Sequence, residues 1–178
     1  MDYFIIRPDK RLVNPPKLSL PVNEKSSKAL DLNIYPKPIL VSVKTTGHYE
    51  YPDYFETPLM MISEKLKRII SKYERTITFQ TAVLMNREQS HQEVYYVMNV
   101  PELDIASAEY KRDRLSGKKP ELILIEENIK NARIFKIKDA GNQLIIRLDV
   151  AESLLRRGAS GIIFEKIKVD ICEVKEDG

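Results

Sequence analysis

The stretch LIIRLDVAESLLRRGASGIIFEKI, residues 144–167, contains the local pattern that decides the fold. Its short apolar run Leu144–Leu148 predicts a strand. Asp149, with Glu152 three residues later, then predicts a capping box at the start of a helix over Asp149–Arg157. That helix has an apolar stripe that we expect to face the core, formed by Val150, Ala151, Leu154 and Leu155.

Two glycines mark the end of this helix and the turn that follows it. Gly158 comes directly after two arginines, and it predicts a C-terminal residue in the left-handed conformation. A tight turn that ends at Gly161 then predicts reversal of the chain into a strand over Ile162–Cys172. The first part of that strand is apolar on both faces, so we expect Ile163 and Phe164 to be buried.

The same order of signals occurs earlier, in PLMMISEKLKRIISKYERTITFQTAVLM, residues 58–85. An apolar run leads to Ser63, a preferred N-cap, and Glu64 places negative charge in the first turn. Apolar residues then recur at helical spacing and predict a helix over Ser63–Tyr73. The run Thr76–Met85 predicts the strand that follows. On this helix we expect three residues in the core, namely Leu66, Ile69 and Ile70.

Shorter strand signals lie between these two strand–helix–strand units. Residues 93–100, 121–125 and 132–137 predict strands, and Glu126–Asn131 predicts a short helical turn. Residues 102–120 are charged and end in a Ser-Gly-Lys-Lys-Pro breaker, so we expect a loop with some helix. The sum is an α+β fold of about seven or eight strands, in mixed or antiparallel sheets with two main short helices.

The length of the chain fits one domain over residues 1–178, because domains average about 150 residues. Eight of the ten prolines lie in residues 1–58, and proline removes backbone donors and restricts the residue before it. We therefore expect residues 1–40 to form an extended, proline-rich arm. The first strand–helix–strand half then covers residues 41–105, and the second covers residues 121–172.

Composition and charge place the chain among globular proteins. Hydrophobic residues make up 43% and charged residues 31%, and 29 lysines and arginines against 26 acids give a net charge of +3. That balance does not favour a protein that coats nucleic acid with a basic stripe. The opening residues 1–12 lack the apolar core of a signal peptide, and no window approaches the roughly 18 apolar residues of a membrane span. We expect a cytoplasmic protein with no membrane partner.

The residues that usually carry catalysis are few and scattered. Neither His48 nor His91 has a partner at metal-ligand spacing, and the single cysteine, Cys172, lies in a predicted strand. The sequence contains no glycine-rich phosphate loop and no G-x-S-x-G elbow. We therefore predict no catalytic, cofactor-binding or metal-binding residue. A small enzyme on an unfamiliar fold stays an alternative, which a pocket that brings acids to either histidine would favour.

Two basic clusters keep a nucleic-acid-associated regulator open as a further alternative. The first cluster falls on the predicted helix and consists of Lys65, Lys67, Arg68 and Lys72. The second lies in residues 111–119 and consists of Lys111, Arg112, Arg114, Lys118 and Lys119. No signature of a nucleic-acid-binding module accompanies either cluster, so a solvated surface is the simpler interpretation.

Four separated segments carry a resemblance to a known family. They are YPDYFETPLMMISEKLKRII (51–70), EVYYVMNVPELD (93–104), ARIFKI (132–137) and LIIRLDVAESLLRRGASGIIFEKI (144–167). In this order they resemble an immunity-protein domain family of bacterial polymorphic-toxin systems, and the closing helix–turn–strand motif carries most of the likeness. The resemblance implies a non-enzymatic inhibitor without a cofactor, which binds one cognate toxin domain and blocks it.

One stretch combines aromatic and acidic residues in the way that binding surfaces do. GHYEYPDYFE, residues 47–56, contains no lysine or arginine. Aromatic side chains with few rotamers are favoured interface anchors, and acids beside them would steer a basic toxin face. We expect at least two of its four rings to be exposed; rings packed in the core are the alternative, and the basic segment 111–119 is then the next candidate. The predicted partner contacts are Tyr49, Glu50, Tyr51, Asp53, Tyr54, Phe55 and Glu56.

Overall fold

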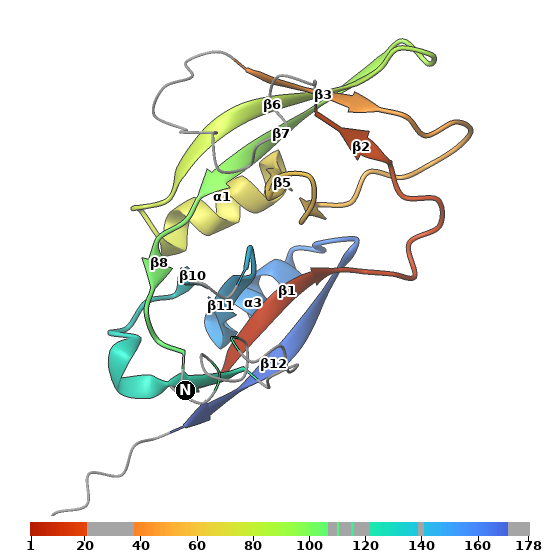
Figure 1. Cartoon of the computed structure of the whole chain (residues 1–178). Coiled ribbons are helices and arrows are strands. Elements are labelled where there is room, and N and C mark those ends of the chain that lie inside the picture. The colour runs from red at the N-terminus through yellow and green to blue at the C-terminus, as the bar shows by residue number, and fades with distance from the viewer. Residues whose placement is uncertain (21–37, 107–109, 111–114, 116–121, 139–140, 171–178) are drawn as a thin grey trace, which may run out of the picture.

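In the part of the chain that the structure describes, a computed structural model shows two six-stranded sheets together with helices α1 (Glu64–Tyr73) and α3 (Leu148–Arg156) (Figure 1). The structure describes residues 1–20, 38–106, 110, 115, 122–138 and 141–170. Both sheets are mixed, so the expected α+β class with mixed sheets and two main short helices is confirmed. Within the described part of the chain, no helix has the length and the apolar content needed to cross a bilayer.

The first sheet contains the N-terminal strand and the C-terminal half of the chain. Its strand order is β8-β10-β11-β1-β12-β9, with antiparallel pairs at the centre and a parallel pair at each edge. These strands are β1 (Tyr3–Pro8), β8 (Glu102–Leu103), β9 (Ile123–Ile125), β10 (Ile134–Ile137), β11 (Leu144–Arg147) and β12 (Ile162–Asp170). A 3-10 helix, Glu126–Asn128, follows β9 where the short helical turn was expected.

The segment 1–40, expected to form an extended arm, begins with a strand, and its residues 21–37 lie outside the described residues. Residues 3–8 are a central strand, paired with β11 on one side and β12 on the other. Ile5 lies opposite both Ile145 and Glu165. The strand was missed because both of its partners lie more than a hundred residues away, and local pattern says nothing of such pairing.

The second sheet is built from strands that lie between Leu18 and Asn99 in the sequence, and it has the strand order β2-β3-β6-β7-β5-β4. Its strands are β2 (Leu18–Ser19), β3 (Ile39–Val43), β4 (Tyr54–Phe55), β5 (Met61–Ser63), β6 (Thr78–Asn86) and β7 (His91–Asn99). The long hairpin of β6 and β7 confirms the strands predicted at Thr76–Met85 and at 93–100. The neighbouring pair of β3 and β6 is parallel.

Helix α1 spans Glu64–Tyr73 and agrees with the sequence prediction. Ser63 is its N-cap, and its hydroxyl oxygen accepts a hydrogen bond of 3.3 Å from the backbone N–H of Leu66. Ile69 and Ile70 are buried together with Leu66, as the helical spacing predicts. The cap and the apolar stripe are local signals, which is why the sequence locates this helix well.

Helix α3 spans Leu148–Arg156 and begins one residue before the predicted start. The predicted capping box is wrong, because the N-cap position is Arg147 and no side chain caps the helix there. Asp149 lies inside the first turn, and both of its oxygens accept hydrogen bonds from Arg147, at 2.8 and 2.7 Å. Strand β11 runs directly into the helix, so the Asp149 carboxylate lies inside the first turn, where it binds mainly the Arg147 guanidinium and also the backbone N–H of Val150.

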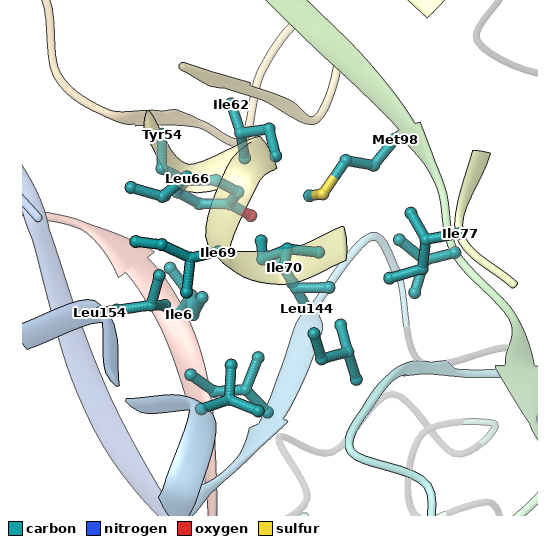
Figure 2. Close-up of a cluster of buried hydrophobic side chains, with 14 of the residues drawn as sticks. Ile6, Tyr54, Ile62, Leu66, Ile69, Ile70, Ile77, Met98, Leu144 and Leu154 are labelled. Atoms are coloured by element: carbon teal, nitrogen blue, oxygen red, sulfur yellow. The ribbon is translucent and has the colours of Figure 1, made fainter. Parts of the chain in front are cut away.

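The main core lies between the two sheets and is shared by both helices. Helix α1 packs on β5 and β7, helix α3 packs on β1 and β11, and the helices pack on each other. Figure 2 shows Leu66, Ile69 and Ile70 of α1 in one cluster with Ile6 and Leu144 of the first sheet. The two sheets are therefore held together by one continuous apolar cluster.

Three of the residues expected in the core are not fully buried. Leu155 is 59% exposed and Ile163 is 37% exposed, while Phe164 is partly buried against the main core. The apolar stripe of α3 is narrower than predicted and consists of Val150, Ala151 and Leu154. In β12, Phe164 pairs with buried Ile6 and Ile163 pairs with Arg7, so alternation turns Ile163 outward.

Candidate functional site

The tyrosine-rich segment 47–56 lies between β3 and β5 and is mostly buried. Tyr54 is 0% exposed and Phe55 is 7% exposed, while Tyr49 and Tyr51 are partly buried against the core of the second sheet. The expectation that at least two of these rings are exposed is therefore wrong. The reason is that Tyr54 and Phe55 form β4, which has one core cluster on each face, so both of its alternating side chains find apolar partners.

A polar network fixes the two partly buried rings. The hydroxyl oxygens of Tyr49 and Tyr51 lie 3.3 Å apart, and the side-chain amide of Asn86 donates a hydrogen bond of 2.6 Å to the Tyr49 hydroxyl. Burial, together with the hydrogen bond to Tyr49, raises the pKa of Tyr51 above its ordinary value. Of the seven predicted contact residues, only Glu50 is fully exposed.

Asp53 is a buried carboxylate that joins the two halves of the chain. It accepts hydrogen bonds from the Ser63 hydroxyl at 2.6 Å and from the Ser160 N–H at 2.7 Å, and it pairs with Lys65 at 2.6 Å. Burial alone would raise the pKa of Asp53, but the bonds from Lys65, Ser63 and Ser160 outweigh it and lower the pKa. Glu56 likewise pairs with Arg7 at 3.1 Å. Both acids act in the fold rather than at a free surface.

The two glycines after α3 allow the turn that follows this helix to contact the Asp53 carboxylate. Gly158 has a φ of +66°, which confirms the left-handed helix end, and its N–H donates to the Leu155 carbonyl at 3.0 Å. Gly161 has a φ of +69°, and a Cβ at this position would overlap Pro52. The glycines therefore let the turn approach the Pro52–Asp53 backbone closely enough for the N–H of Asp53 to bond the Ser160 carbonyl at 2.9 Å.

The histidines lie at the surface of the second sheet, away from the main core. Nε2 of His91 is 3.1 Å from a carboxylate oxygen of Glu93, and its ring centroid is 5.8 Å from that of Tyr51. His48 is exposed in the loop after β3. Among the described residues, no three His, Cys, Asp or Glu side chains come together as a metal site. Cys172 and most of the basic segment 111–119 lie outside the described residues.

A surface groove of about 400 Å³ lies between α1 and α3. Its lining residues are Glu64, Lys65, Arg68, Ile69, Lys72 and Arg157. The sequence indicates the basic face of α1, but it does not show that Arg157 joins that face, because the helix contact that brings it there is a tertiary one. A second depression, of about 550 Å³, lies beside the N-terminus and β12 and is lined by residues of mixed charge.

Comparison with known protein families gives one match. The family model described as Immunity protein family (Imm11) matches residues 5–169, from β1 to β12. The match therefore takes in both sheets, both helices and the groove between the helices. No curated protein matches the chain.

Proposed function

The chain belongs to the Imm11 family of immunity proteins, and from this membership we propose that it binds and neutralises one cognate toxin domain of a bacterial polymorphic-toxin system. The family match over residues 5–169 is the observation that carries the proposal. The proposed site of action is the cytoplasm of the producing cell, where a toxin made by the same cell must be blocked.

The proposed mechanism is inhibition by occupancy, without turnover. The chain would cover the working surface of the toxin and would stay bound. The family match supports this mechanism, because the family is described as one of immunity proteins. An inhibitor of this kind needs a tight interface, and stable complexes commonly bury about 1,600 Å² in total.

The tyrosine-rich segment plays a smaller part in this proposal than the sequence indicates. Its buried residues Tyr54 and Phe55 pack in the core, and Asp53 connects α1 with the turn after α3. A toxin contact there stays a prediction for exposed Glu50 and for the partly exposed edges of Tyr49 and Tyr51.

Co-expression tests the proposed function. The probe is the toxin domain encoded by the gene directly upstream of the gene for this chain, expressed in a bacterial host with and without the chain. We expect growth arrest with the toxin domain alone and restored growth when the chain is present. The matched control is an unrelated immunity protein expressed at the same level, which should not restore growth. Arrest that persists at equal expression of both proteins would refute the function.

A further inference from the structure

The groove between α1 and α3 is lined by exposed cations from α1 and from the end of α3, and it faces solvent. We propose that this groove docks the toxin domain and that it receives an acidic face of that partner; this rests on the proposed function. Four of its six lining residues are cations, against the single acid Glu64. The surface is therefore complementary to carboxylates, and it differs from the acidic surface expected of an inhibitor that mimics nucleic acid.

The positions of these cations show which of them can serve a partner. Lys65 is already used, because its ammonium group pairs with Asp53 at 2.6 Å and donates to the Gly158 carbonyl at 2.8 Å. Arg68 pairs with Glu64 at 3.0 Å, but its side chain is 76% exposed. Lys72 is exposed and forms no ion pair with any residue in the described ranges. The charge that remains for a partner comes mainly from Lys72 and Arg157.

Arg157 is held in an orientation suited to binding. Its guanidinium donates to the hydroxyl and to the carbonyl of Ser153, one turn earlier in α3. Both acceptors are uncharged, so the positive charge of Arg157 stays uncompensated by any described residue. A guanidinium that is already oriented loses less conformational entropy when it pairs with a carboxylate. The next residue, Arg156, is exposed and adds to the charge at this helix end.

Helix α3 also exposes apolar side chains. Ile69 lines the groove but is only 5% exposed, whereas Leu155, in the last turn of α3, is 59% exposed. Leu148 lies seven residues earlier on the same side of the helix and is 39% exposed. Arginine is enriched among the residues that contribute most to the binding energy of an interface, so we expect Arg157 to contribute more than these leucines.

The arrangement favours a protein over a nucleic acid. The cations surround one groove at the meeting point of two helices, whereas a nucleic-acid surface usually presents a basic stripe that follows the backbone. Family membership also implies a protein toxin as the partner.

Charge reversal in the groove tests the proposal. The purified chain is titrated with a catalytically inactive form of the toxin domain encoded by the upstream gene, and the dissociation constant is measured. Lys72→Glu should weaken binding about tenfold, and the pair Arg68→Glu/Lys72→Glu should weaken it further. The matched control is Lys44→Glu/Arg87→Glu, which makes the same change of charge at exposed positions directly after β3 and β6. It should change the dissociation constant less than about threefold. Melting temperatures of all variants are recorded, and Lys72→Glu alone serves if the double variant does not fold.

The possible outcomes separate a failure of the proposed docking groove from a failure of the proposed function. If the unmodified chain binds the toxin domain and the groove variants bind equally well, the groove is not the docking surface and the proposed function stands. If the control loses as much affinity as the groove pair, overall charge is responsible and the proposal fails. If the unmodified chain does not bind the toxin domain, the function fails and this inference fails with it.

A second probe separates protein from nucleic acid. A single-stranded dT12 oligonucleotide is titrated under the same buffer and salt conditions. We expect binding far weaker than that of the toxin domain, with no dependence on Lys72. Oligonucleotide binding of comparable strength that Lys72→Glu abolishes would overturn the proposal in favour of a nucleic-acid surface.

Discussion

The carboxylate of Asp53 accepts hydrogen bonds from both the N–H and the hydroxyl of Ser160, which lies 107 residues further along the chain. The same carboxylate accepts from Ser63 at the start of α1 and pairs with Lys65 in its first turn. The buried side chain of Asp53 thus connects the tyrosine-rich segment, helix α1 and the turn that follows helix α3.

Removal of this carboxylate should destabilise the protein, because it takes one acceptor away from several donors at once. Asp53→Ala leaves two serine hydroxyls and an ammonium group without their shared acceptor, and hydrogen bonds to charged groups contribute about 1.5–3 kcal/mol each. We expect the free energy of unfolding to fall by about 3 kcal/mol, measured by urea denaturation. Glu50→Ala is the matched control in the same segment and should change stability by less than about 0.5 kcal/mol, because Glu50 is exposed. Equal loss in both variants would contradict the role of Asp53.

The low pKa of Asp53 predicts acid sensitivity of the fold. A carboxyl group with a lower pKa in the folded state than in the unfolded state stabilises the fold fully above its unfolded pKa, and that stability is lost as the pH falls through the folded pKa. We therefore expect the urea concentration at which half of the protein is unfolded to decrease as the pH is lowered from 5 to about 3. Asp53→Asn should flatten this part of the profile, because an amide does not titrate. An unchanged profile in the variant would assign the acid sensitivity to other carboxyl groups.

The two glycines after α3 should differ in how they tolerate a methyl group. Gly158→Ala meets only the penalty for positive φ, about 1 kcal/mol, because nothing lies within 4 Å of the added Cβ. Gly161→Ala meets the same penalty and also overlaps Pro52, so we expect it to cost at least about 2 kcal/mol more. Denaturant titration of both variants measures the difference. Equal costs would show that the approach of the turn to Pro52 does not matter for stability.

The hydroxyl of Tyr54 is buried and has no hydrogen-bond partner among the described residues. Burial raises the pKa of this tyrosine, with a smaller contribution from the charge of Glu56. Because an unpaired buried hydroxyl costs about 1–3 kcal/mol, Tyr54→Phe should leave stability unchanged or raise it. Tyr95→Phe is the contrasting variant and should destabilise, because the Tyr95 hydroxyl donates to the Pro52 carbonyl. A clear loss of stability in Tyr54→Phe would mean that an ordered water satisfies this hydroxyl.

Local signals in the sequence predict the helices well and the long-range pairing poorly. The cap at Ser63, the stripe of α1 and the left-handed Gly158 depend on neighbours within a few residues, and the structure confirms each of them. Strand β1 depends on partners at the other end of the chain, and nothing in residues 1–8 reveals them.

The candidate site was harder to predict for the same physical reason. Aromatic and acidic residues alternate both in a binding loop and in a short strand that is covered on its two faces, and only tertiary contacts separate the two cases. Tyr54 and Phe55 belong to such a strand, because each packs into a different core cluster. The groove depends on the contact of α1 with α3, which places Arg157 in the lining of a groove whose other lining residues belong to α1.

Titration of the toxin's own activity with the purified chain tests the central claim most directly. The toxin domain is held at a fixed concentration well above the dissociation constant, and its residual activity is measured as the chain is added. Neutralisation by occupancy predicts that activity falls linearly and reaches its minimum at a fixed stoichiometric ratio. It also predicts that intact, active toxin is recovered after the complex is dissociated. Loss of activity at a small fraction of that ratio, or recovery of chemically altered toxin, would show that the chain acts as an enzyme and would contradict the account.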